Sequence, residues 1–69
     1  MYELVLVFSL ITAQGQYEDY LRARIDYEFR TETGCYLSGA TDLSAMFQGG
    51  LAEALSPGTV IFIECNRIN

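Results

Sequence analysis

The segment from residue 21 to residue 33 constrains the fold more than any other part of the chain, because apolar and charged residues alternate along it. The apolar positions are Leu21, Ala23, Ile25, Tyr27 and Phe29, and the charged positions between them are Arg22, Arg24, Asp26, Glu28 and Arg30. A strand places alternate residues on opposite faces, whereas a helix would spread these apolar residues around most of its circumference. The pattern therefore predicts a strand. The alternative for residues 16–32 is a helix that ends at Gly34, a residue typical of helix C-terminal caps.

Two further strands are predicted in the first 41 residues. Residues 2–10 are rich in β-branched and aromatic side chains, which favour a strand. The second face of this segment is only partly polar, as is typical of a central strand. After a turn at Thr33 and Gly34, the small residues of segment 35–41 predict a third strand that another backbone approaches closely.

The last third of the chain predicts a helix followed by a strand. Apolar residues from Leu43 to Leu55 recur at helical spacing. Thr41 or Asp42 could cap the helix, and the following Pro57-Gly58 would end it. We expect Gly50, on the apolar stripe, to let the helix lie close to the sheet. Residues 59–65 then predict a final strand.

These elements predict a single α+β domain over residues 1–69, with the order β-β-β-α-β and one helix on one face of a mainly antiparallel sheet of about four strands. The last strand is expected beside the first, in the centre of the sheet, and parallel to the first and third strands. A chain of this size buries only about 60% of the surface that its unfolded form exposes. It therefore depends on good packing, a staple or a partner.

The two cysteines are expected to be free thiols. Cys35 would open the third strand and Cys65 would close the fourth, which places them at opposite ends of parallel strands, too far apart for a disulfide. The helical alternative for residues 16–32 changes the topology and would allow them to pair. With no His in the chain, a structural zinc site is disfavoured, and a nucleophilic cysteine would lack a base. No cofactor is predicted.

The apolar run at residues 4–11 could be mistaken for a signal peptide. It lacks a positively charged start, since Glu3 stands in that place, and it is too short to span a bilayer. We therefore expect a strand, a reducing environment for the thiols and a cytoplasmic protein that does not insert into a membrane.

The clearest candidate for function is the face of the sheet that a single helix would leave open. This face would carry Val5, Val7 and Ile11 of the first strand, with Val60 and Phe62 of the last, beside the charges of the second strand. An apolar patch with a charged rim is typical of a binding surface or a dimer interface. The loop segment Tyr17-Glu18-Asp19-Tyr20 adds two tyrosines, a residue favoured in interfaces. The predicted partner-binding residues are Val5, Val7, Ile11, Tyr17, Glu18, Asp19, Tyr20 and Phe62.

Other functions have weaker support. Asp26 and Glu28 could carry acid–base chemistry, but their interleaving with arginines is typical of a solvated charge ladder. Direct nucleic-acid binding is disfavoured by the net charge of −5 and the absence of Lys. A small enzyme that uses Asp26, Glu28 or Cys35 ranks third. A nucleic-acid binder ranks last; it would face RNA with Arg22, Arg24 and Arg30 and with Tyr27 and Tyr36, but the acids between the arginines argue against it.

The leading hypothesis is therefore a non-enzymatic protein-binding module that occupies a partner surface, such as that of a basic nucleic-acid-binding complex. In its compact, acidic build the chain resembles phage-type inhibitors of the anti-CRISPR and DNA-mimic kind. That resemblance implies an inhibitor in the cytoplasm of a host cell. The alternative is a homodimeric assembly subunit whose sheets pack face to face.

Overall fold

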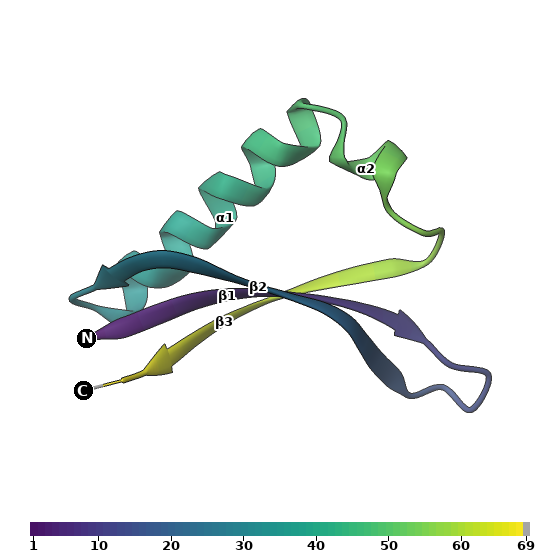
Figure 1. The fold of residues 1–69 in the computed structure, drawn as a ribbon, viewed down its shortest axis with the longest axis horizontal. Helices are drawn as coiled ribbons and strands as arrows, with labels where there is room; N and C mark the ends of the chain where they lie inside the picture. Colours follow the sequence, from purple (N-terminus) through teal and green to yellow (C-terminus); the bar gives the residue numbers. More distant parts are fainter. Residues whose placement is uncertain (69) are drawn as a thin grey trace.

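The computed structural model describes residues 1–68, which form a three-stranded antiparallel sheet with one main helix on one face (Figure 1). The elements, in chain order, are β1 (Tyr2–Ile11), β2 (Tyr17–Phe29), α1 (Glu32–Gln48), α2 (Leu51–Ala54) and β3 (Thr59–Arg67). The predicted α+β class is thereby confirmed. The expected count of about four strands is one too high.

The first strand occupies the centre of the sheet, as predicted. β2 pairs with one edge of β1 and β3 with the other, in the order β2-β1-β3. Residues 4–9 of β1 are all buried, because the side chains of β1 are covered on both faces. Such a continuous buried run is typical of a strand without a solvent face.

The alternation in β2 does correspond to a strand, so the helical alternative for residues 16–32 is wrong. The pairing of β2 with β1 is irregular at two places, between Glu3 and Val5 and between Phe8 and Ser9. At the first place, Glu3 pairs with Glu28 and Val5 with Arg24. Residues 25–27 of β2 thus lie opposite the single residue Leu4 of β1, which makes a bulge on the outer strand.

The main correction concerns residues 35–41, which lie in α1 and not in a third strand. The helix begins much earlier than predicted, and its N-cap is Thr31, whose Oγ1 accepts a hydrogen bond from the Gly34 amide at 3.0 Å. Neither Thr41 nor Asp42 caps it. With one strand fewer, the chain enters the last strand in the opposite direction, so that β3 is antiparallel to β1 and not parallel to it.

Small residues explain both how α1 packs on the sheet and why residues 35–41 are predicted as a strand. In α1 the buried residues are Cys35 and Gly39, one turn apart. A Cβ atom built on Gly39 would lie 2.8 Å from Ile63 Cγ2 and 3.0 Å from Leu4 Cδ1. The segment therefore does meet another element closely, as its small residues suggested, but it does so as a helix on the sheet.

The helix packs on the sheet from Cys35 as far as Leu43, and not along its last turn. Residues 44–49 are all exposed, and Figure 1 shows α1 rising from the sheet toward its C-terminal end. Gly50 then adopts a left-handed backbone with φ of 97° between α1 and α2. No atom lies within 4 Å of a Cβ built there, so the expected close approach of Gly50 to the sheet is wrong.

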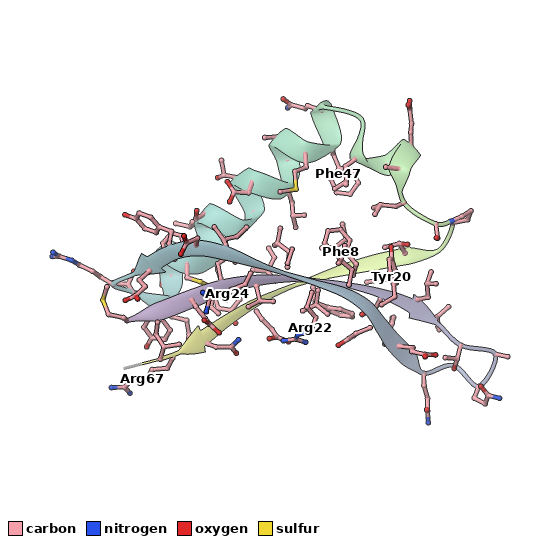
Figure 2. All side chains as sticks on the ribbon, viewed as in Figure 1. Phe8, Tyr20, Arg22, Arg24, Phe47 and Arg67 are labelled. Carbon is pink, nitrogen blue, oxygen red and sulfur yellow. A yellow bond between two sulfur atoms is a disulfide. The ribbon has the colours of Figure 1, made fainter. Side chains whose placement is uncertain are left out.

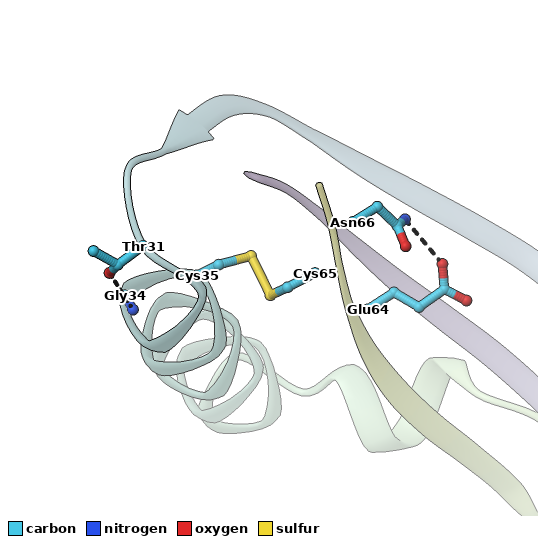
Figure 3. The surroundings of a disulfide bond; sticks show 6 residues. All are labelled: Thr31, Gly34, Cys35, Glu64, Cys65 and Asn66. Carbon is cyan, nitrogen blue, oxygen red and sulfur yellow. Dashed lines mark hydrogen bonds between the residues drawn. A yellow bond between two sulfur atoms is a disulfide. The ribbon is translucent and has the colours of Figure 1, made fainter. Parts of the chain in front are cut away.

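The two cysteines form a disulfide, which contradicts the expectation of free thiols. Figure 3 shows the bond joining the first turn of α1 to the far end of β3. The Cα atoms of Cys35 and Cys65 are 6.1 Å apart, within the range that disulfides span. The expected separation failed because it assumed that Cys35 opened a strand.

Candidate protein-binding site

The structure places the predicted partner-binding residues on both faces of the sheet. We call the face opposite α1 the open face. Of the predicted residues, Val5 and Val7 are buried, with 5% and 2% of their surface exposed. The expectation that they form an exposed patch is wrong.

Side chains from the two outer strands cover these valines. Val5 lies between Arg24 and Glu64 in the sheet, and Val7 lies between Arg22 and Phe62. Residues directly opposite each other in a sheet project from the same face, so that long neighbours can close over a short central one. An open sheet face in a small protein is therefore not an exposed face at every position.

A charged network spans this face above β1. Arg22 Nη2 donates to Glu64 Oε1 at 2.6 Å, and Arg22 Nη1 lies 3.4 Å from Asp19 Oδ2. The buried Ser9 hydroxyl donates to Asp19 Oδ1 at 2.6 Å. The network thus joins all three strands, and it satisfies the buried hydroxyl of the central one.

The network also changes proton affinities. The hydrogen bond from Arg22, followed by one from Asn66, lowers the pKa of Glu64. The hydrogen bond to Glu64 in turn raises the pKa of Arg22. Both side chains are partly exposed, at 49% for Arg22 and 37% for Glu64, so solvent screens this pair.

Four apolar side chains remain exposed on the open face, at the end of the sheet nearest the β1–β2 turn. We call them the open-face patch: Ile11, Tyr17, Val60 and Phe62. Their exposed fractions are 57%, 56%, 36% and 40%, in that order. Tyr17 pairs with Ile11 across the strands, and its ring meets Phe62 edge-on at a centroid distance of 5.3 Å. The patch is therefore continuous from β2 across β1 to β3.

The other two predicted residues belong to the helix side. Glu18 lies opposite Leu10, on the positions that alternate away from the open face. Tyr20 projects toward the helix side beside Phe8 (Figure 2), with a ring distance of 6.5 Å. Its hydroxyl lies 2.9 Å from Thr59 Oγ1. The segment from Tyr17 to Tyr20 therefore does not act as one exposed loop, because it is part of β2.

Sequence reasoning missed a hollow of about 510 Å³ between the C-terminal half of α1, α2 and the start of β3. Leu43, Phe47, Leu55, Pro57 and Ile61 are among its lining residues. Figure 2 shows Phe47 projecting from α1 toward the sheet. The hollow exists because α1 diverges from the sheet, and only the Gly49-Gly50 pair in the sequence pointed to a change of direction there.

Within residues 1–68, no three or more His, Cys, Asp or Glu side chains gather where they could hold a metal ion. In the same part of the chain, no helix is both long and apolar enough to cross a membrane. Asp26 and Glu28 lie on β2 at the bulge, where they line a hollow of only about 60 Å³. This space is too small to hold a substrate, since ligand sites occupy roughly 300–1,000 Å³.

No protein-family model matches this chain, and no curated protein or solved structure is similar enough to match it.

Proposed function

We propose that this chain is a non-enzymatic protein-binding module that uses the open-face patch to occupy a partner surface. The observation that supports this proposal is the continuous exposure of Ile11, Tyr17, Val60 and Phe62 on one face. Burying apolar side chains is favourable in free energy, and these four side chains remain exposed to solvent. A partner that covered them would supply that favourable burial on binding.

The surroundings of the patch indicate the kind of partner. Asp19 and Arg22 lie next to it, and the chain as a whole carries a net charge of −5. A basic protein surface with an apolar centre would complement both features. Inhibition of a basic nucleic-acid-binding complex, in the manner of a phage-type inhibitor, is the form of this proposal that fits the charge.

We propose that binding relies on apolar contacts, and not on a row of carboxylates that mimics the phosphates of a nucleic acid. On the open face, Arg22 interrupts the acidic side chains by pairing with Asp19 and Glu64, and Arg24 does so by approaching Glu3 at 3.5 Å. A nucleic-acid mimic would need unpaired carboxylates at regular spacing. The inhibitor would therefore be held by Tyr17 and Phe62, with the charges selecting the orientation.

The test compares three immobilised proteins in lysate of the cells that contain the chain: wild type, Phe62→Glu and Leu37→Glu. Leu37 is 64% exposed on α1, so Leu37→Glu makes the same chemical change away from the patch. We expect a specific protein to bind wild type and Leu37→Glu and to be lost from Phe62→Glu. Circular dichroism would establish that all three are folded. Equal binding by all three would reject the patch as the site.

A homodimer with its open faces packed together is the second candidate, because the same patch could bury itself against a second copy. It predicts a mass that rises with concentration and returns to that of the monomer in Phe62→Glu. It also predicts that no foreign protein is retained from the lysate.

The location in the cell is a further proposal. The sequence predicts a cytoplasmic protein, whereas disulfides persist mainly in oxidising compartments. Alkylation of thiols in intact cells separates the two. Labelling of Cys35 and Cys65 supports the cytoplasm, and protection of both supports an oxidising compartment.

A further inference from the structure

β2 lies at one edge of the sheet, in the order β2-β1-β3. Within residues 1–68, β2 pairs only with β1 and only on one side, so a row of its backbone groups faces outward over residues 17–29. Such an edge can pair with another strand. The helix does not cover it, because α1 crosses to β3 and is tied there by the disulfide.

The backbone pattern shows which residues point outward. The Ile68 amide donates to the Met1 carbonyl at 3.1 Å, and antiparallel pairs alternate between bonded and non-bonded positions. Odd-numbered residues of β1 therefore bond to β3, and even-numbered ones bond to β2. Val5 and Val7 pair with Arg24 and Arg22, so the backbone N–H and C=O of these two arginines point away from the sheet. Glu28 also points outward, because it pairs with the odd-numbered Glu3. Asp26 lies in the bulge, and counting alternate residues from either Arg24 or Glu28 places it outward.

We propose that β2 pairs with β2 of a second copy, antiparallel, with the two Ile25 residues opposite each other. In this register Arg24 lies across from Asp26 of the second copy, and Arg22 lies across from its Glu28. The apolar residues match as well, because Ala23 lies across from Tyr27. Opposite charges placed directly across two strands stabilise their pairing.

No neighbouring register does as well. Only outward-pointing residues can bond across the new edge, so the register can change only in steps that keep this parity. One such step places Arg24 opposite Arg24, and the other places Asp26 opposite Asp26. Like charges directly opposite each other are unfavourable, so the Ile25-centred register is selected by charge.

The carboxylates needed for this pairing are available. Among the described residues, no ion pair or hydrogen bond involves the side chain of Asp26 or Glu28. Arg24 has 67% of its side chain exposed and contacts Glu3 only at 3.5 Å. Arg24, Asp26 and Glu28 can therefore form interchain pairs without first breaking a strong contact, whereas Arg22 would bind the Glu28 of the second copy while it still contacts Glu64 and Asp19.

The bulge at the β2 edge sets the expected strength. Bulges weaken edge pairing, so we expect a dimer that forms and dissociates with concentration and not an obligate one. The two-fold axis would run perpendicular to the sheet and leave both open-face patches on one side. This inference goes beyond the proposed function, and either can fail alone.

The test is a charge swap measured by sedimentation equilibrium up to about 1 mM, a concentration at which an association of only about 4 kcal/mol is detected. The variants are Arg24→Asp, Asp26→Arg and the double variant with both. We expect each single variant to weaken the dimer about tenfold or more, since like charges then face each other. The double variant should return to within about threefold of wild type, because the pairs are reversed but complementary.

Glu53→Arg is the matched control, since it makes the same charge change as Asp26→Arg on α2, away from the edge. It should leave the dimer unchanged. Circular dichroism of all variants shows that the monomer is folded. A monomer at every concentration would overturn the proposal, as would a dimer that resists both single variants or that the double variant fails to restore. A dimer broken by Phe62→Glu and not by Arg24→Asp would place the contact on the open face instead.

Discussion

Gly39 is the residue at which α1 meets the sheet, and its missing side chain is required there. Gly39→Ala gains about 1 kcal/mol of helix propensity, but its Cβ would lie 2.8 Å from Ile63 Cγ2. Overpacking costs about 1–3 kcal/mol. We expect a net loss of about 1 kcal/mol in the free energy of unfolding, measured by urea denaturation.

The control for this substitution is Gly49→Ala. Gly49 has a φ of −84°, which any residue can adopt, and the nearest atoms to its built Cβ lie at 3.5 Å. It should be neutral or slightly stabilising. Equal effects of the two substitutions would show that Gly39 is not a packing contact.

The ion pair between Arg22 and Glu64 predicts a dependence of stability on pH. Because the pKa of Glu64 is lower in the folded chain than the ordinary value of about 4.3, the pair stabilises the fold above that value. The stabilisation is lost as the pH falls through the folded-state pKa. In Arg22→Gln, NMR titration should show the pKa of Glu64 rising toward the ordinary value. No change in that pKa would mean that Arg22 is not its main partner.

Residue patterns predicted the open face only in part. The period of two assigns Ile11, Val60 and Phe62 correctly to one surface, since alternation fixes the side of a strand, whereas Tyr17 is expected in a loop and lies in β2. It could not show that Val5 and Val7 are covered, because that depends on which longer side chains lie across from them. Register decides this, and a bulge such as the one opposite Leu4 has no clear signature in the sequence.

At the scale of elements, the sequence predicts the first half of α1 wrongly, as a turn and a strand in place of a helix. Its buried positions, Cys35 and Gly39, are small, so the first half of the helix lacks the apolar stripe by which amphipathic helices are recognised. The spacing of four between these residues is that of a helix, but two small residues give a much weaker signal than a stripe of large apolar ones. By contrast, β1 and β3 could be predicted because apolar and β-branched residues dominate them.

The disulfide stabilises the attachment of α1, whose buried residues are small, to the sheet. It joins positions 30 residues apart, and closing a loop of that length stabilises by about 3–4 kcal/mol in the chain-entropy model. We expect a Cys35→Ala, Cys65→Ala double variant to lose a similar amount in guanidinium denaturation. A reducing agent should lower the stability of wild type to that of the variant and leave the variant unchanged. Equal stability of wild type and variant in the absence of reductant would contradict this role.

At the scale of the whole molecule, stability is concentrated around β1. Residues 4–9 are buried on both faces, whereas residues 44–49 at the end of α1 are exposed. Segments with few buried contacts open at a lower free energy than the core does. Since the disulfide holds only the first turn of α1, the helix should be most stable at that end.

Hydrogen exchange followed by NMR tests this gradient. We expect the amides of residues 4–8 to exchange slowest, those of residues 36–40 at intermediate rates, and those of residues 45–48 at least about tenfold faster than the first half of the helix. The physical reason is that residues 45–48 are exposed, because the hollow of about 510 Å³ separates this end of α1 from the sheet. Uniform protection along α1 would show instead that the two ends of the helix unfold together, and that the hollow does not weaken the attachment of the helix.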